Sequence, residues 1–141
     1  MASVRWADLY RWSLVEVEFG TPKKDIVDKD CADINRDYVY GINSNNEFSY
    51  RHMAIVISKN IRNSSVTVVP LTEAKEGDMD NISRIVLEHR KYRKFLYKDT
   101  SILIDNITTI EKRVRIKRII LSWIPKPLRR KIQKSMLHSF K

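Results

Sequence analysis

Two runs of apolar, mostly β-branched residues, at 53–58 and 65–71, constrain the fold of this chain more than any other feature. Side chains branched at Cβ fit the pleated surface of a sheet better than the crowded turns of a helix, so both runs are predicted to be strands. The first run, Met-Ala-Ile-Val-Ile-Ser, is continuous enough to be buried on both faces. Asn60, Asn63 and Ser64 supply the turn that joins the two runs.

Shorter segments with strand character surround this pair. Residues 13–19 alternate in period two before Gly20 ends the pattern. Residues 83–88, 101–105 and 107–110 also favour strands, the last two either separate or joined as one bent strand. Residues 89–96 indicate a turn or a helical piece, and residues 114–123 fit either a strand or a helix.

The C-terminal segment has the pattern of an amphipathic helix. Pro127 suits the first helical position, and Leu128, Ile132 and Met136 recur at every fourth residue with basic side chains off that line. Many short strands and one terminal helix predict a mainly β fold, a small antiparallel barrel with appended helices. A length of 141 residues fits a single domain, residues 1–141.

Charge is distributed unevenly along the chain. Residues 1–50 hold 6 basic and 9 acidic side chains, whereas residues 51–141 hold 21 basic and 8 acidic ones. The polar, aspartate-rich stretch 21–50 is typical of a long functional loop. A basic half of this size attracts polyanions such as nucleic acid, anionic lipid or an acidic protein segment.

Several kinds of protein and site do not fit this sequence. The single cysteine, Cys31, fits a reducing compartment, and no apolar run approaches the roughly 18 residues of a membrane span. No apolar core of a signal peptide follows residues 1–5, so we expect a cytoplasmic location without membrane contact. No GxSxG, HExxH or glycine-rich phosphate loop is present, and His52, His89 and His138 are far apart in sequence. We therefore expect neither a metal nor an organic cofactor.

Three blocks of sequence match a known family in its own order. Residues 48–60, Phe-Ser-Tyr-Arg-His-Met-Ala-Ile-Val-Ile-Ser-Lys-Asn, are similar to Gly-x-Arg-Pro-Ala-Val-Val-Ile-Ser-Asn-Asp, and residues 68–72 read Val-Val-Pro-Leu-Thr. Residues 98–112 are similar to Lys-Asp-Ser-Val-Val-Leu-Val-Asp-Gln-Ile-Arg-Thr-Ile-Asp-Lys, and residues 11–19 match Arg-Gly-Asp-Ile-Val-x-Val-Asp-Phe more loosely. Over most of residues 11–113 the chain thus resembles the MazF/PemK (Kid) toxins of type II toxin–antitoxin systems.

The resemblance implies an SH3-like barrel, about residues 11–113, followed by a basic helical segment, about 114–141, and a symmetric homodimer. It also implies a metal-independent, sequence-specific endoribonuclease toxin that cuts single-stranded RNA, mRNA above all, and that an acidic antitoxin neutralises. The 2′-hydroxyl of the RNA would attack the neighbouring phosphate and leave 2′,3′-cyclic phosphate and 5′-hydroxyl ends. Because RNA brings this nucleophile, the protein needs only to position the strand, move protons and stabilise the phosphate.

Residue by residue, the resemblance assigns four catalytic candidates. Thr72 takes the place of the family's threonine, a donor to a non-bridging phosphate oxygen. The family's arginine falls on His52 or, with a gap, on Arg51. An imidazole, with an ordinary pKa near 6.5, suits proton transfer. We expect His52 as acid/base and Arg51 as a phosphate contact, and because strand neighbours point to opposite faces we expect one of the two in the groove. Asp105 matches the family's aspartate and is expected to orient the catalytic pair or accept a hydrogen bond from a base.

The RNA contacts expected around these residues combine rings and polar groups. Phe48 and Tyr50, with Tyr92 and Phe95 as further candidates, lie among basic residues and suit base stacking. Asn106 stands where the family has glutamine, Thr108 where it often has arginine, and Trp12-Ser13 where it has Gly-Asp. The full set of expected RNA-binding residues is Tyr50, Phe48, Lys59, Asn106, Thr108, Lys112 and Arg113.

Two other functions fit the same barrel. One is a catalytically inactive module that binds RNA or protein, since the arginine and glycine positions differ from the family's pattern. The other is an inhibitor that acts like a gyrase poison.

Overall fold

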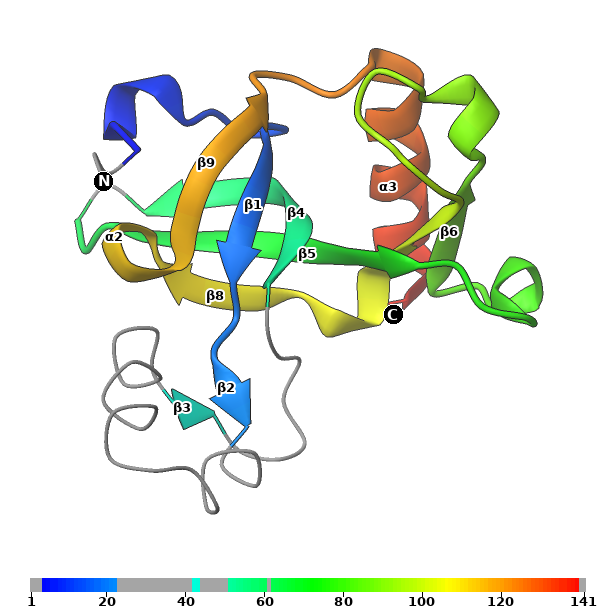
Figure 1. Ribbon diagram of the computed structural model, residues 1–141, viewed down its shortest axis with the longest axis horizontal. Helices are drawn as coiled ribbons and strands as arrows, with labels where there is room; N and C mark the ends of the chain where they lie inside the picture. The colour runs from blue at the N-terminus through cyan, green and yellow to red at the C-terminus, as the bar shows by residue number, and fades with distance from the viewer. Residues whose placement is uncertain (1–3, 23–41, 44–50, 61, 140–141) are drawn as a thin grey trace.

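The computed structural model describes residues 4–22, 42–43, 51–60 and 62–139 (Figure 1). The predicted acidic loop 21–50 lies outside the described residues, apart from two short strands, β2 (Thr21–Pro22) and β3 (Ile42–Asn43), which pair in parallel. Phe48 and Tyr50 also lie outside the described residues.

Seven of the described strands form one sheet, whose order is β6-β7-β5-β4-β1-β9 with β8 also paired to β5. Its pairings are antiparallel, and β5 pairs with β8 through its first half and with β7 through its last three residues. This change of partner along one strand curls the sheet into a half-barrel (Figure 1). The strands are β1 (Leu14–Glu18), β4 (Arg51–Asn60), β5 (Ser65–Glu73), β6 (Arg84–Leu87), β7 (Thr100–Leu103), β8 (Thr108–Glu111) and β9 (Ile116–Leu121).

Short helical segments connect the strands, and one long helix ends the described chain. They are η1 (Trp6–Asp8), η3 (Asp78–Asp80), η4 (His89–Lys91), η5 (Ile104–Asn106), α2 (Lys112–Arg115) and α3 (Lys126–Ser139). The curled antiparallel sheet with one C-terminal helix confirms the predicted mainly β, barrel-like fold. The region 101–110 is two strands separated by η5, and the ambiguous region 114–123 is mostly β9.

The sheet is buried on both faces, as the apolar run 53–58 predicted. On β4, Ile55 and Ile57 pack into one apolar cluster, whereas Ala54 and Val56 pack into another on the opposite face. Strand β5 alternates in the same way, with Val69 and Leu71 in the first cluster and Val66 and Val68 in the second. Alternation of side chains across a strand explains this division.

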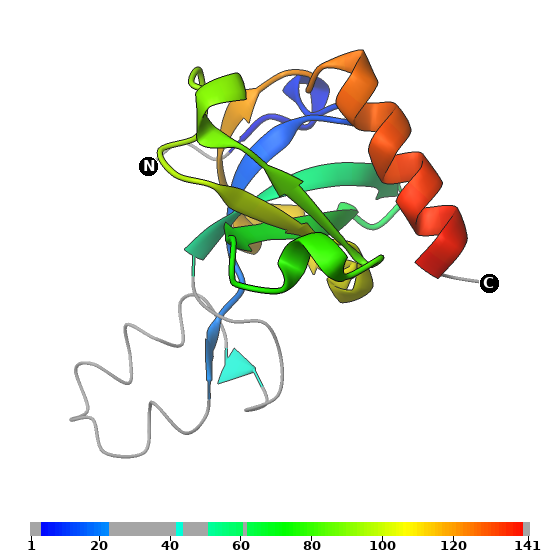
Figure 2. The same cartoon turned by 90° about the vertical axis from the view of Figure 1, so that its right-hand side faces the viewer.

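Helix α3 closes the first cluster. It stands beside β6 at one side of the curled sheet (Figures 1 and 2), and Leu128 and Ile132 are buried in that cluster. Met136 packs against the cluster from the next turn, so the predicted apolar line of this helix is its packing face. Pro127 lies in the first turn, where the missing backbone N–H leaves no helical hydrogen bond unmade.

Removing apolar volume from the packing face of α3 should cost much of the stability, whereas the same change on its exposed face should not. Ile132 is 0% exposed and Leu137 is 75% exposed on the same helix. We expect Ile132→Ala to lower the free energy of unfolding by about 2 to 5 kcal/mol because it leaves a cavity. Leu137→Ala should change it by less than about 0.5 kcal/mol in urea unfolding. Equal losses in the two variants would contradict this packing of α3.

Asp78 gives the stability a dependence on pH. Its Oδ2 accepts hydrogen bonds from the backbone N–H of Lys75 at 2.8 Å and from the Ser101 hydroxyl at 2.7 Å. These two donors, the Lys75 N–H first, hold the pKa of Asp78 below its usual 3.8. A carboxyl whose pKa is lower in the folded than in the unfolded state stabilises the protein above the unfolded pKa and loses this effect as the pH falls through the folded pKa.

We therefore expect the stability gap between the wild type and Asp78→Asn to be constant from neutral pH down to about pH 5 and to narrow below about pH 4. Urea unfolding across this range measures the gap, and an undiminished gap at the acid end would refute the assignment.

Candidate functional site

The start of β4 and the end of β5 bring predicted catalytic residues together. The β4–β5 ladder ends where Ala54 pairs with Pro70, and beyond it residues 51–53 pair with β1 while residues 71–73 pair with β7. A pocket of ≈ 430 Å³ lies at this end of the two strands. Its lining residues are Arg51, His52, Met53, Leu71, Thr72, Glu73, Lys98 and Thr100.

Both Arg51 and His52 line this pocket, contrary to the expectation that only one of them would enter it. The alternation of neighbours along a strand holds for the faces of a sheet. This pocket lies instead at the strand's first residues, where side chains from either face reach it. His52 has the ring of Phe19 beside it, with centroids 6.3 Å apart.

Carboxylates of β1 hold Arg51 in place. Glu18 is its partner in the β1–β4 register, and Arg51 lies 3.6 Å from the Oε2 of Glu18 and 3.6 Å from the Oε1 of Glu16. The side chain of Arg51 stays 45% exposed, so its guanidinium is both oriented and accessible. Burial and, next, the charge of Arg51 lower the pKa of the neighbouring Lys117.

A second pocket of ≈ 380 Å³ adjoins the first. The two share Arg51, His52 and Met53, and we call them together the β4–β5 groove. The residues found only in the second pocket are Glu16, Lys94, Phe95, Tyr97, Arg118 and Ile120. The groove therefore has one arm beside Thr72 and another beside Tyr97, joined at the start of β4.

Cations outnumber carboxylates along the groove, and several are already paired. Arg118 pairs with Glu16 at 3.2 Å, and Lys98 pairs with Glu73 at 3.1 Å. Lys98 and Glu73 are 62% and 64% exposed, so their pairing contributes little to stability and is easily exchanged for another anion. An anionic chain that enters the groove thus meets guanidinium and ammonium groups that carboxylates already orient. These ion pairs are weak, so the cations can exchange their carboxylate partners for the incoming anion.

Asp105 lies outside this group of residues. It belongs to η5, forms an ion pair with Arg84 of β6, and does not line either arm of the groove. Of the four predicted catalytic residues, the structure brings together Arg51, His52 and Thr72.

The predicted RNA contacts within the described residues are dispersed away from the groove. Lys112 is 8% exposed, and Arg113 pairs with Glu111 at 3.2 Å. Asn106 ends η5, and its carbonyl accepts a hydrogen bond from the Thr108 hydroxyl at 2.9 Å. Neither these four residues nor Lys59 lines the groove.

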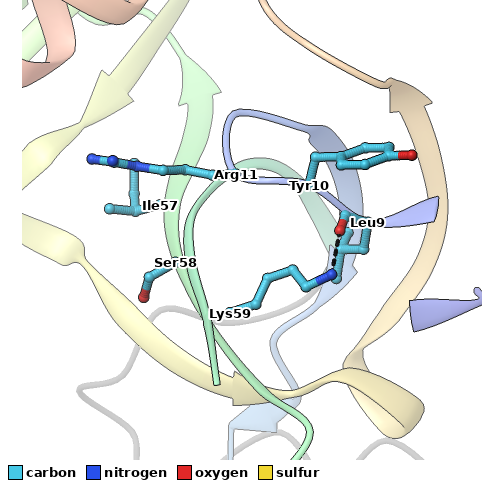
Figure 3. A pocket seen from close by; sticks show the side chains of 6 residues that line it. All are labelled: Leu9, Tyr10, Arg11, Ile57, Ser58 and Lys59. Atoms are coloured by element: carbon cyan, nitrogen blue, oxygen red, sulfur yellow. Dashed lines mark hydrogen bonds between the residues drawn. The ribbon is translucent and has the colours of Figure 1, made fainter. Parts of the chain in front are cut away.

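Lys59 lines a different pocket of ≈ 520 Å³ at the other end of β4 (Figure 3). Its ammonium donates to the carbonyl of Leu9 at 2.7 Å and to that of Trp6 at 3.0 Å. The same group lies 4.7 Å from the centroid of the Trp6 ring. Leu9, Tyr10, Arg11, Ile57 and Ser58 line the rest of the pocket, so its described walls contain no imidazole or carboxylate for proton transfer.

Sequence reasoning missed four residues of the groove: Lys94, Tyr97, Lys98 and Arg118. The first three belong to the basic, aromatic stretch that follows β6, in which only Tyr92 and Phe95 were singled out. Its high density of rings and cations was the available signal. Arg118 could not be predicted from the sequence, because it approaches the groove only through the pairing of β9 with β1.

The described part of the chain contains neither a cluster of metal ligands nor a membrane-spanning helix. Within it, no three His, Cys, Asp or Glu residues gather in a way that could hold a metal ion. No helix in the described ranges is long and apolar enough to cross a membrane.

Comparison with known proteins identifies the family. The PemK-like, MazF-like toxins of type II toxin–antitoxin systems match residues 38–140, so the chain belongs to this family. It is accordingly a type II toxin by family, a class defined by pairing with an antitoxin. A crystal structure of an Mtb toxin shares the fold, with a TM-score of 0.50 and 14% identity over 63% of this chain and 92% of that one. No curated protein matches the chain in sequence.

Replacing Lys59 should distinguish a structural lysine from an RNA contact. We expect Lys59→Met to lower the free energy of unfolding by about 1 to 2 kcal/mol, because two carbonyls lose a charged donor. The control is Arg62→Met, in the exposed turn after β4, which should change stability by less than about 0.5 kcal/mol. Urea unfolding measures both. Unchanged stability of Lys59→Met with weaker RNA binding would support the RNA contact instead.

Proposed function

We propose that this toxin is a metal-independent endoribonuclease that cleaves single-stranded RNA in the β4–β5 groove. The observation that carries the proposal is the meeting of Arg51, His52 and Thr72 in one cationic pocket. These groups are an acid/base, a fixed cation and a hydroxyl, which together suffice for a reaction whose nucleophile belongs to the substrate.

In the proposed reaction the 2′-oxygen of the RNA attacks the adjacent phosphorus, and the bond from phosphorus to the 5′-oxygen breaks. His52 takes the proton from the 2′-hydroxyl, and the departing 5′-oxygen takes a proton from solvent water, so a 2′,3′-cyclic phosphate and a 5′-hydroxyl result. Arg51 and the Thr72 hydroxyl donate to the non-bridging oxygens, where negative charge grows in the transition state. Asp105 has no part in this scheme because it is paired with Arg84 outside the groove.

The carboxylates beside Arg51 support the role proposed for its guanidinium. Glu16 and Glu18 hold Arg51 from β1 before substrate binds, so its guanidinium loses little freedom when it contacts a phosphate. Fixed donors that await the developing charge are more effective in catalysis than donors that must reorient.

The partner follows from the same surface. We propose that an acidic antitoxin segment neutralises the toxin by placing its carboxylates against Arg51, Lys94, Lys98 and Arg118, where the RNA phosphates would otherwise lie. Messenger RNA in the cytoplasm is the proposed substrate. The symmetric homodimer implied by the motifs is part of the same proposal.

Cleavage of a labelled RNA in the presence of EDTA tests the reaction. Loss of the acid/base in His52→Ala should slow cleavage by about a hundred- to ten-thousandfold. Loss of the phosphate donor in Thr72→Ala should slow it by about a hundred- to a thousandfold. His138→Ala, which removes an exposed imidazole of α3, is the matched control and should cleave like the wild type. Replacing the 2′-hydroxyl at the cleavage position by hydrogen should abolish the reaction, and the product should carry a cyclic phosphate.

Cleavage that survives in both His52→Ala and Thr72→Ala would remove the proposed site. A wild-type protein that binds RNA without cutting it would contradict the reaction and favour the inactive binding module. DNA breaks in cells without loss of mRNA would contradict it in favour of a gyrase-poison-like inhibitor.

A further inference from the structure

The segment between β6 and β7 forms one wall of the β4–β5 groove, and its composition is unusual. Residues 89–98 read His-Arg-Lys-Tyr-Arg-Lys-Phe-Leu-Tyr-Lys, with five lysines and arginines, three aromatic rings and no acidic side chain. Lys94, Phe95 and Tyr97 of this segment line the arm of the groove that lies away from Thr72.

The segment is held firmly at a few points. Leu96 is 2% exposed in the first core cluster, and its backbone N–H donates to the carbonyl of Tyr92 at 3.0 Å. The rings of Tyr92 and Phe95 are in contact, with centroids 5.7 Å apart. At the base of the segment, the N–H of His89 donates to the Asp99 carboxylate at 2.9 Å.

This anchoring presents Tyr97 to solvent. It follows the buried Leu96 directly, yet it is 90% exposed, more than any other large hydrophobic or aromatic residue of the described chain. A ring held in the open beside a cationic groove has both faces available for stacking. Bases of single-stranded nucleic acid stack on such rings, and nearby cations contact the phosphates that join them.

We propose that Tyr97 and Lys94 form a base-binding subsite for a nucleotide that flanks the cleaved phosphodiester. The base stacks on the Tyr97 ring and the adjoining phosphate contacts the Lys94 ammonium. Arg51, His52 and Met53 line both arms of the groove, so the subsite lies next to the proposed cleavage position, within reach of a neighbouring nucleotide of the same strand. This inference rests on the proposed function, because it takes RNA as the ligand of the groove.

The binding test uses a fluorescein-labelled single-stranded RNA that carries 2′-O-methyl groups throughout and cannot be cleaved. Tyr97→Ala should weaken its binding by about tenfold or more, whereas Tyr97→Phe, which keeps the ring, should bind like the wild type. Lys94→Ala should weaken binding and reduce the slope of affinity against salt by about one ion. The controls are Met79→Ala, 81% exposed on η3, and Arg62→Ala, an exposed cation that does not line the groove. Because Tyr97 is exposed, its variants should unfold at the wild-type temperature.

Abasic substitutions identify the ring's partner. A series of RNAs, each lacking one base near the cleavage position, is bound to the wild type and to Tyr97→Ala. For the RNA that lacks the base stacked on Tyr97, the two proteins should bind with equal affinity, because the stacking contact is already lost. With cleavable RNA, Tyr97→Ala should raise KM and leave kcat unchanged, as expected for a contact made equally before and during the reaction.

The subsite would be overturned if Tyr97→Ala bound the RNA with wild-type affinity. It would also be overturned if the difference in affinity between the wild type and Tyr97→Ala were undiminished at every abasic position. This failure is distinct from failure of the proposed function. His52→Ala and Thr72→Ala that still cleave would remove the reaction site while leaving the binding measurements on the uncleavable RNA intact.

Discussion

Strands β4 and β5 pair along most of their length, and each carries apolar side chains on both faces. A strand that is buried on both sides cannot slip by one residue without moving both sets of side chains to the wrong face. The register of these two strands is therefore fixed by the core over residues 54–60 and 65–70, and both strands continue from there to the pocket that His52 and Thr72 line. The site is thus an extension of the core pairing, and its geometry is set before any substrate contact is made.

The turn before β1 shows how strongly the core governs the local backbone. Trp12 has φ of 76°, a left-handed conformation that glycine adopts without strain, and it stands where the family's motif has glycine. Its N–H donates to the Val56 carbonyl at 2.7 Å and its own carbonyl accepts from Ile124 at 3.0 Å, which ties the turn to β4 and to the start of α3. The ring is 8% exposed in the first cluster, and burial of so large a side chain outweighs a backbone cost of about 1 to 2 kcal/mol.

The fold and three of the four candidate catalytic residues could be predicted from local patterns and motifs, whereas the other contacts of the candidate site depend on long-range pairing. Runs of β-branched residues predicted β4 and β5, and every-fourth spacing predicted the packing face of α3. Motif spacing placed Thr72 and His52 at strand ends, and the fold brings these two ends to one pocket. The same spacing could not reveal that Arg84 pairs with Asp105, because β6 and η5 meet only in the folded chain. The sequence could not reveal the contacts of Lys59 for a similar reason, since its ammonium donates to the carbonyls of residues 6 and 9, which are distant in sequence.

The two arms of the groove, proposed to carry the reaction and the recognition of a base, have different structural supports. Thr72 and His52 belong to strands whose displacement would disrupt both core clusters, so their relative position is rigid. Tyr97 and Lys94 belong to a connection that is fixed chiefly by the burial of Leu96 and by the bond between His89 and Asp99. Changes in that connection leave the β4–β5 register untouched, because loops on a rigid scaffold vary at little cost to the core. Under the proposed function, a groove built in this way can change the bases it accepts while it keeps the groups proposed to act on the phosphate.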